Sequence, residues 1–310
     1  MPMPHEEMRR LIKRRIRGKD GAERIDALKA CLDLLPGYYS GPYGELRKWV
    51  TEEIAQARVR KQSRHTDSLA VPRQGDAQIV LLGPPNAGKS SLLKALCGRQ
   101  VAVGDYPFTT LRPIAATALI NHAHIQLVEI PGLIEGAHMG KGGGKQLLAC
   151  ARNADGLIYV LPLDDGGMDG LRIVMQEVSH LDLELTPLVV CTKNDLPGAD
   201  AVWQAVQSEF AAHALLSVST GTGAGLEALR AAIWSMSGLM RVFPRRNNQS
   251  GTPFILQRDS TLRDFARAVH REIAGRVNKG RVFGESAKFP GQLVGPDHVL
   301  LDGDQVEIIV

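Results

Sequence analysis

A glycine-rich loop is the most specific chemical pattern in the sequence. Residues 83–90 fit G-x-x-x-x-G-K-[ST], in which glycines let successive backbone N–H groups face one anion at a helix N-terminus. Lys89 can reach the β- and γ-phosphates of a nucleotide and is the expected catalytic cation, and the Ser90 hydroxyl can ligate Mg²⁺. An ordinary glycine-rich turn is the alternative. The residues expected to bind nucleotide here are Gly83, Pro84, Pro85, Asn86, Ala87, Gly88, Lys89, Ser90 and Ser91.

A second pattern indicates which base the nucleotide carries. The run Thr192-Lys193-Asn194-Asp195 follows an apolar stretch and ends in a carboxylate that can accept from N1–H and N2–H₂ of guanine. Adenine lacks that pair of donors, and sites of this kind discriminate by roughly 10⁴-fold. After the next apolar stretch, backbone N–H groups are expected to meet the guanine oxygen. These residues, supported mainly by their position, are Ser217, Val218 and Ser219.

Two further segments carry groups suited to the γ-phosphate end. Glu129 ends an apolar stretch and would hold a water on Mg²⁺, while the Gly132 N–H would sense the γ-phosphate. Thr110 is the expected switch ligand of Mg²⁺ and γ-phosphate, with Thr109 as the runner-up. The glycine-rich residues 136–144 suit a second switch or a plain flexible loop. The expected contacts are Phe108, Thr109, Thr110, Glu129, Ile130, Pro131 and Gly132, and the expected catalytic residues are Lys89, Thr110 and Gly132.

These residues can form one site only if they follow strands that end at the same edge of a sheet. The hydrophobic pattern predicts such strands. Short apolar runs alternate with amphipathic stretches, which predicts an α/β fold with a mostly parallel sheet, helices on both faces and ligands at the carboxyl ends of the strands. Residues 115–120 and 125–130 form a predicted hairpin. The other expected strands are 79–82, 157–161, 188–192 and 215–218, and the expected helices are 91–97, 171–181, 201–212 and 226–239.

Length and composition suit a globular protein of two or three domains. The chain has 310 residues, of which 44% are hydrophobic and 23% charged. No apolar run is long enough to span a bilayer and the charged N-terminus is unlike a signal peptide, so we expect a cytoplasmic protein without membrane contact. The cysteines are isolated from one another, which argues against disulfides and zinc; they are Cys31, Cys97, Cys150 and Cys191.

The two ends of the chain are basic. Residues 1–66 hold 15 Lys and Arg against 9 Asp and Glu, residues 67–240 hold 11 against 16, and residues 241–310 hold 11 against 8. A slightly acidic centre with basic ends favours nucleotide chemistry in the middle and contact with a polyanion at the ends.

The N-terminal part reads as a small basic helical segment. Apolar residues at helical spacing predict helices at 6–19, 22–35 and 46–64, with a linker near 67–75. The arginines and lysines of the first helix could bind RNA phosphate, or they could form a solvated helix face. The cluster is Arg9, Arg10, Lys13, Arg14, Arg15 and Arg17.

The C-terminal part reads as short strands around one helix. A helix is expected from Thr261 to about Ile273, and the expected strands are 253–256, 282–283, 292–294 and 306–310. Its cations give an electrostatic basis for binding RNA. They are Arg258, Arg263, Arg267, Arg271, Arg276, Lys279 and Arg281.

Together these runs resemble a known family. Residues 84–91, 105–110, 131–137 and 192–195 resemble the Obg/DRG family of GTPases, and residues 295–304 resemble the end of a TGS domain, a ubiquitin-like β-grasp fold. The resemblance implies an N-terminal helical segment, a P-loop GTPase domain and a TGS domain. The implied bounds are 1–74, 75–240 and 241–310.

The resemblance also implies an activity. It implies hydrolysis of GTP to GDP and phosphate with Mg²⁺, and switch loops that couple the nucleotide state to binding of a ribosome or structured RNA. An Asn at the position of Asn86 helps potassium-activated relatives to hold K⁺, so K⁺ stimulation is expected unless Asn86 only stabilises the loop. The sequence departs from the family at Glu129, where Asp is usual, and at Arg112, where a small or apolar residue is usual.

Two other functions stay open. Leu133 stands where Ras-like proteins place a water-orienting Gln, and with Glu129 it makes a non-catalytic GTP- or GDP-dependent adaptor with negligible hydrolysis conceivable. An ATPase with relaxed base choice is disfavoured by the intact run at 192–195. The sequence also leaves open a stabilising or activating protein partner.

Overall fold

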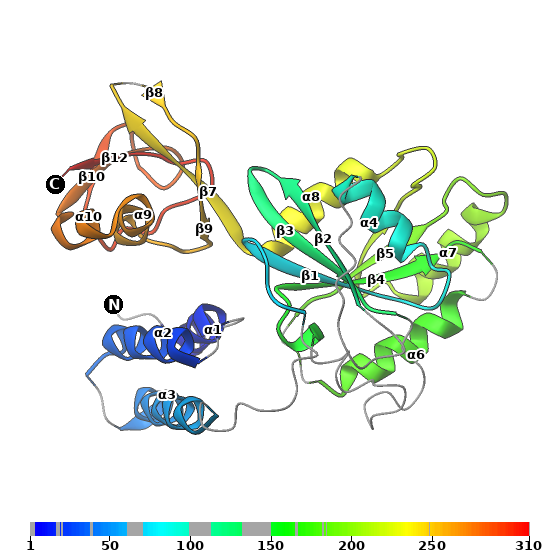
Figure 1. Cartoon of the computed structure of the whole chain (residues 1–310), viewed down its shortest axis with the longest axis horizontal. Helices are drawn as coiled ribbons and strands as arrows, with labels where there is room; N and C mark the ends of the chain where they lie inside the picture. The colour runs from blue at the N-terminus through cyan, green and yellow to red at the C-terminus, as the bar shows by residue number, and fades with distance from the viewer. Residues whose placement is uncertain are drawn as a thin grey trace. The chain divides into compact units, whose positions relative to one another are not determined.

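The chain folds into two compact units, residues 1–70 and 71–310, in the computed structural model (Figure 1). Among the residues that the structure describes, no helix is long and apolar enough to cross a membrane. The described residues are 4–16, 19, 21–37, 40–60, 71–98, 113–131, 150–164, 167–181, 183, 185–247 and 249–309.

The described part of the N-terminal unit is helical, as expected. It contains α1 (His5–Ile16), α2 (Gly21–Leu34) and α3 (Gly41–Arg60). All three contribute to one apolar core, because each carries buried side chains at helical spacing. The third helix begins at Gly41, five residues before the expected start at residue 46. The core residues are Met8, Ile12, Ile16, Leu28, Cys31, Leu35, Leu46, Val50 and Ile54.

A six-stranded sheet organises the middle of the chain, in the order β2-β3-β1-β4-β5-β6. All neighbouring strands are parallel except the hairpin of β2 and β3. The predicted α/β fold is therefore confirmed, and the parallel strands end at a common edge. The strands are β1 (Ala77–Leu82), β2 (Ile114–Ile120), β3 (Ala123–Glu129), β4 (Gly156–Pro162), β5 (Leu188–Thr192) and β6 (Ala214–Ser217).

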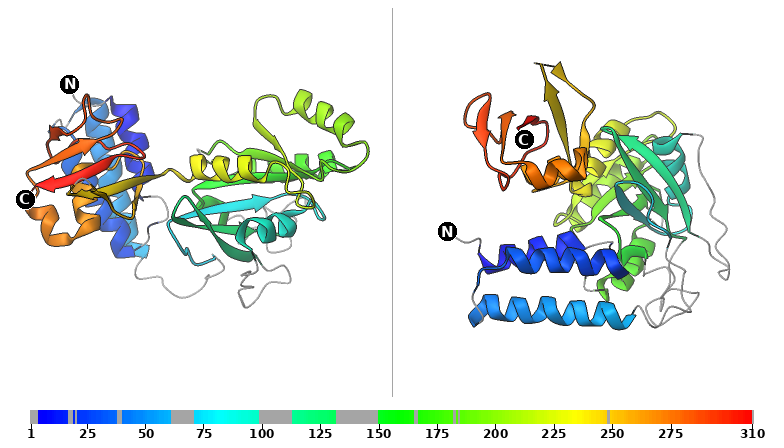
Figure 2. Two further views of the ribbon diagram at one scale, coloured as in Figure 1. Left: turned by 90° about the horizontal axis from the view of Figure 1, so that it is seen from above. Right: turned by 60° about the vertical axis from the view of Figure 1, so that its left-hand side comes forward.

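Helices cover both faces of this sheet (Figure 2). Successive residues of β1 point to opposite faces: Val80 and Leu82 share a core with α6 and α7, while Ile79 and Leu81 share one with α4 and α8. Such a strand, buried on both faces, reads as the continuous apolar run seen in the sequence. The helices are α4 (Lys89–Cys97), α6 (Gly167–Ser179), α7 (Ala199–Glu209) and α8 (Leu226–Ser237).

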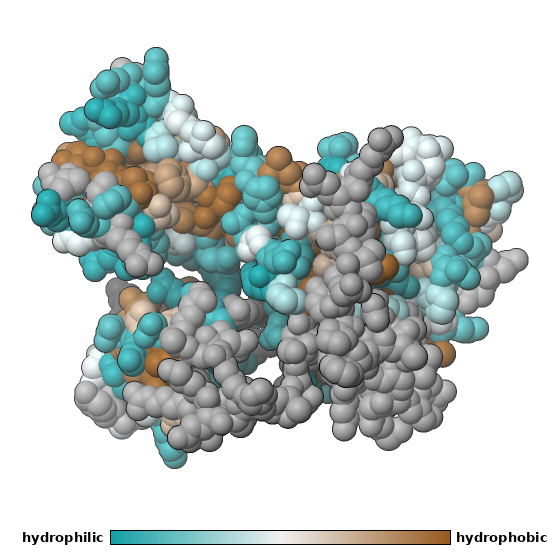
Figure 3. Space-filling view, viewed as in Figure 1, coloured by the Kyte–Doolittle hydropathy of each residue, from teal (hydrophilic) through white to brown (hydrophobic). Residues whose placement is uncertain are grey.

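The C-terminal part forms a second sheet, in the order β11-β10-β12-β7-β8, with β9 paired to β7. Phe265 of α9 is fully buried beneath it. Apolar surface also remains exposed over this domain (Figure 3). The elements are β7 (Leu239–Arg246), β8 (Gln249–Ser250), β9 (Phe254–Gln257), α9 (Leu262–Val269), α10 (Arg271–Arg276), β10 (Lys279–Phe283), β11 (Gln292–Val294) and β12 (Gln305–Ile309).

One expected helix is in fact two. Thr261 caps α9 with a reciprocal pair of hydrogen bonds to Asp264, so the start of the helix is as predicted. The helix stops at His270, whose backbone is extended (φ −163°, ψ 132°), and α10 follows as a separate turn. The prediction of one helix as far as Ile273 was therefore wrong.

Candidate nucleotide-binding site

The loop between β1 and α4 has a backbone that requires its glycines. A Cβ on Gly83 would lie 2.2 Å from the Val160 carbonyl oxygen of the neighbouring strand. Gly88, at the N-cap of α4, has a φ of 87°, and Asn86 also has a positive φ, of 61°. The loop thus turns back toward the helix N-terminus, where backbone N–H groups and the helix dipole favour an anion.

Lys89 begins α4 and lies inside this loop. Its side chain is buried, and Nζ donates to the carbonyl oxygens of Gly83, at 2.9 Å, and Pro84, at 2.8 Å. Burial lowers the pKa of the Lys89 ammonium, and the negative charge of Glu129 counteracts part of that shift. The cation is therefore held at the centre of the loop, within reach of any phosphate bound there.

Ser90 and Glu129 come together beside the lysine. Glu129 ends β3 opposite Leu81 of β1, which brings its side chain to the loop that follows β1. Ser90 Oγ donates to Glu129 Oε1 at 2.9 Å. Glu129 Oε2 is buried and has no hydrogen-bond partner among the described residues. The pair brings together two oxygen atoms, one of them anionic, of the kind that Mg²⁺ prefers.

The side chains of the described residues form no cluster that could hold Mg²⁺ by themselves. No group of three His, Cys, Asp or Glu side chains gathers anywhere among them. A hydroxyl with one carboxylate nevertheless fits the way Mg²⁺ is usually held in nucleotide sites, by one or two protein ligands together with phosphates and waters. The donor set at Ser90 and Glu129 therefore suits a metal that arrives with its nucleotide.

Residues 192–195, which are expected to contact guanine, are hydrogen-bonded to the loop between β1 and α4. Thr192 Oγ1 donates to the Ala87 carbonyl oxygen at 2.7 Å, and Thr192 is buried. Lys193 follows with a φ of 63°, and its Nζ pairs with Asp164 Oδ2 at 2.5 Å. Asp164 follows β4 and was missed in the sequence. Its only signal there was its place after an apolar strand.

Asn194 and Asp195 continue the run toward β6. The Asn194 backbone N–H donates to the Val218 carbonyl oxygen at 3.3 Å, and its side-chain amide lies 3.5 Å from Ser217 Oγ. Asp195 is exposed. Its Oδ2 lies next to Gly221, since a Cβ on that glycine would be 3.6 Å away. The carboxylate is thus open to a ligand at the edge where the strands end.

The amides expected to meet the guanine oxygen are engaged in this structure. The Val218 N–H donates to the Cys191 carbonyl oxygen at 2.7 Å, and the Ser219 N–H donates to the Ala224 carbonyl oxygen at 2.9 Å. Ser219 Oγ in turn accepts from the N–H groups of Gly221 and Thr222. Residues 217–219 lie at the end of β6, and their contact with a base stays a prediction.

Other predicted residues are placed only in part. Ile130 is buried, with its N–H donating to the Leu81 carbonyl oxygen at 3.1 Å, and Pro131 follows it. Both continue the end of β3 beside the loop. The remaining predicted contacts and switch segments lie outside the described residues, as do Arg112 and Leu133, which the sequence singled out only as differences from related proteins. These contacts and segments are Phe108, Thr109, Thr110, Gly132 and residues 136–144.

Two known families match separate parts of the chain. Residues 78–193 match the family described as 50S ribosome-binding GTPase, and residues 240–310 match the TGS domain. The chain is 27% identical to a developmentally-regulated GTP-binding protein 2 homolog of Dictyostelium discoideum, over 78% of this chain and 85% of that protein. It is 25% identical to the ribosome-interacting GTPase 1 of Saccharomyces cerevisiae, over 77% and 84%. These matches confirm the resemblance to the Obg/DRG family.

Two further similar proteins come from other organisms. An uncharacterized GTP-binding protein of Methanocaldococcus jannaschii is 26% identical to this chain, with 86% of each covered. The solved G domain of the T. maritima FeoB iron transporter is 21% identical, with a TM-score of 0.43, over 52% of this chain and 98% of that domain. The Obg/DRG relatives match across most of their length and confirm the family resemblance seen in the sequence.

Proposed function

We propose that this protein binds GTP with Mg²⁺ at the loop after β1 and hydrolyses it to GDP and phosphate, as its resemblance to the Obg/DRG family implies. The observation that carries the proposal is the 2.7 Å hydrogen bond from Thr192 Oγ1 to the Ala87 carbonyl oxygen. It joins the run that would read guanine to the loop that would hold the phosphates. The bond reaches from the loop after β1 to the end of β5, across the intervening strand β4.

The described residues could neutralise much of the negative charge on the phosphate groups during hydrolysis. Lys89 and the N-terminus of α4 would neutralise the phosphate oxygens, with Nζ turning from the carbonyl oxygens of Gly83 and Pro84 to the nucleotide. Ser90 and Glu129 would hold Mg²⁺, which when bound neutralises the β- and γ-phosphate oxygens. Thr110 and Gly132 are proposed to complete the contacts with the γ-phosphate.

Potassium stimulation is a finer part of the proposal. Asn86 is exposed in the phosphate loop, and no described residue makes a hydrogen bond with its side chain. Its amide oxygen is therefore available to a monovalent cation beside the phosphates. Leu133 cannot orient a water molecule as the Gln of Ras-like proteins does. The positive charge of the bound cation would assist hydrolysis in its absence.

Phosphate release by the full chain tests this function. We expect turnover of GTP to exceed that of ATP by about 100-fold or more, because the Asp195 carboxylate has no donors to meet on adenine. Turnover should be faster in potassium than in sodium buffer. Tight GTP binding without phosphate release would support the adaptor, and equal use of GTP and ATP would contradict the base assignment.

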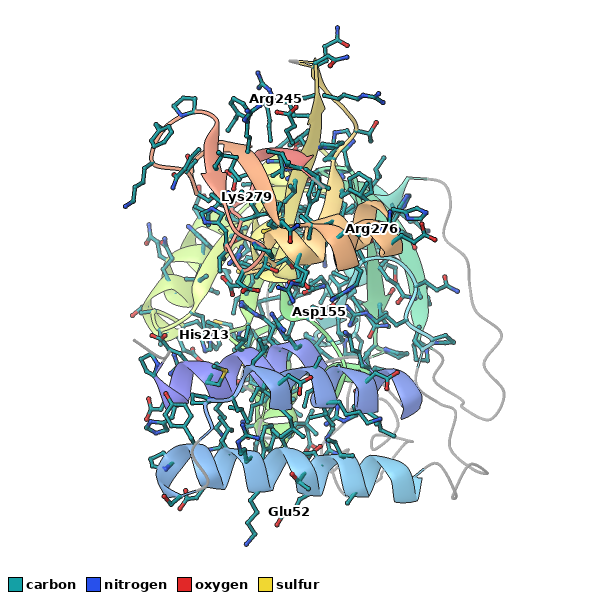
Figure 4. The ribbon with its side chains drawn as sticks, turned by 90° about the vertical axis from the view of Figure 1, so that its left-hand side faces the viewer. Glu52, Asp155, His213, Arg245, Arg276 and Lys279 are labelled. Atoms are coloured by element: carbon teal, nitrogen blue, oxygen red, sulfur yellow. The ribbon has the colours of Figure 1, made fainter. Side chains whose placement is uncertain are left out.

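We further propose that the protein, divided near residues 75 and 240, binds a ribosome or structured RNA through its basic ends. The family description and the yeast relative's name both refer to ribosomes. Several arginines of the C-terminal domain are paired with carboxylates, such as Arg267 with Asp264 at 3.2 Å. Arg276 and Lys279 are exposed on this domain, and neither has an ion-pair partner among the described residues (Figure 4). Of the arginines and lysines that the sequence assigned to RNA binding in this domain, these two are the ones we propose to meet phosphate.

Reversal of those charges should weaken association with ribosomes. The double variant Arg276→Glu, Lys279→Glu is expected to bind about tenfold or more weakly in co-sedimentation at low salt, and the wild-type affinity should fall steeply with added salt. Lys94→Glu, on the exposed face of α4, is the matched control. Undiminished binding of the double variant would remove this surface from the interaction.

A further inference from the structure

The carboxylate of Glu129 is the feature of the phosphate site that differs most from the family pattern. Asp is usual at this position, and Glu adds one methylene, which lengthens the side chain by about 1.5 Å. The backbone leaves no freedom to take up that length. Glu129 is held in register with Leu81, and the next residue's N–H donates to the Leu81 carbonyl oxygen at 3.1 Å.

Glu129 is in direct contact with Ser90. Ser90 Oγ and Glu129 Oε1 are 2.9 Å apart, so no water lies between the hydroxyl and the carboxylate. Mg²⁺ binds six oxygens octahedrally at about 2.0–2.1 Å, which places neighbouring ligands about 2.9 Å from each other. The two side chains are therefore already as close as adjacent ligands of one metal ion.

The second carboxylate oxygen lacks a partner. Glu129 is 92% buried, since only 8% of its surface is exposed, and Oε2 has no hydrogen bond among the described residues. The nearby cation does not satisfy it, because Lys89 Nζ bonds to the carbonyl oxygens of Gly83 and Pro84 and forms no ion pair with Glu129. A buried anionic oxygen without a donor is costly unless a cation or donor meets it.

We propose that Glu129 coordinates the Mg²⁺ of the bound nucleotide directly, through its carboxylate, where the usual Asp would act through a water. The inference rests on the proposed function, since the metal arrives with the nucleotide. Ser90 and Glu129 are then two protein ligands of the ion. The direct anionic ligand replaces one water in the coordination shell and strengthens the hold on the metal in the complex with GDP.

The number of waters on the metal tests the proposal without measuring turnover. The full chain is loaded with GDP and Mn²⁺, and the metal-bound waters are counted from the EPR broadening in ¹⁷O-enriched water. We expect wild-type protein to show one water fewer than Glu129→Asp. Metal affinity of the complex should fall about tenfold in Glu129→Asp and more in Glu129→Gln, which keeps the length and loses the charge.

The controls separate this inference from the function on which it rests. Glu227→Asp makes the same shortening at an exposed position of α8 and should leave both the water count and the metal affinity unchanged. Equal water counts in wild type and Glu129→Asp, with GDP bound to both, would overturn the direct contact alone. If wild-type protein does not bind GDP, the proposed function fails with it.

Discussion

Asp195→Asn is expected to weaken GDP and GTP binding by about 100-fold and to favour xanthosine nucleotides instead. The carboxylate is proposed to accept from both N1–H and N2–H₂ of guanine, and two hydrogen bonds to a charged acceptor account for about 3 kcal/mol or more. An amide keeps one acceptor and adds a donor, which matches the oxygen at position 2 of xanthine. Asp195 is exposed, so the substitution should not disturb the fold.

Competition between guanosine and xanthosine diphosphates for a fluorescent nucleotide measures this change. Asp200→Asn is the matched control, because Asp200 is also exposed and lies nearby in the first turn of α7. The control should keep the wild-type preference for guanine. An unchanged preference in Asp195→Asn would refute the assigned base contact.

Lys89→Ala is expected to reduce GTP and GDP affinity by about 100-fold or more. The ammonium is the buried cation at the centre of the loop, and charge-assisted hydrogen bonds to phosphate are each worth about 1.5–3 kcal/mol. Lys89→Arg should restore little of the affinity, because a planar guanidinium does not fit a cradle of two carbonyl oxygens about 3 Å from Nζ.

Calorimetric titration with GDP and Mg²⁺ measures the loss. Lys94→Ala on the same helix removes a cation that points to solvent and should bind as wild type does. Wild-type affinity in Lys89→Ala would remove the lysine from the phosphate site. A lower GDP affinity of Lys94→Ala would mean that the general positive charge of the helix, and not the Lys89 side chain in particular, attracts the nucleotide.

Much of the central domain could be predicted because its strands are buried on both faces. The continuous apolar run at 188–192 has the same bounds in β5, and the hairpin turns at Asn121 and His122, both with positive φ. In contrast, no strand was predicted at β7, because Pro244, Arg245 and Arg246 interrupt the apolar pattern. Its pairing with β9, β8 and β12 is what makes it a strand, and that pairing is not visible locally.

The candidate site could be predicted as residue types but not as a network. The spacing of the glycines, Lys89 and Ser90 predicted a loop of the observed form. The ion pair of Lys193 with Asp164 joins two strand ends, and the bond from the Val218 N–H to the Cys191 carbonyl oxygen depends on the register of β5 and β6. Such contacts follow from tertiary packing, so no local pattern could have indicated them.

Binding of GDP and ADP to the full chain, measured by calorimetry with Mg²⁺, tests the central claim most directly. We predict heat from one GDP per chain and at least about 100-fold weaker binding of ADP. In the Lys89→Ala variant, the heat of GDP binding should be lost. No heat with either nucleotide would contradict the account, because the loop between β1 and α4 would then hold no nucleotide.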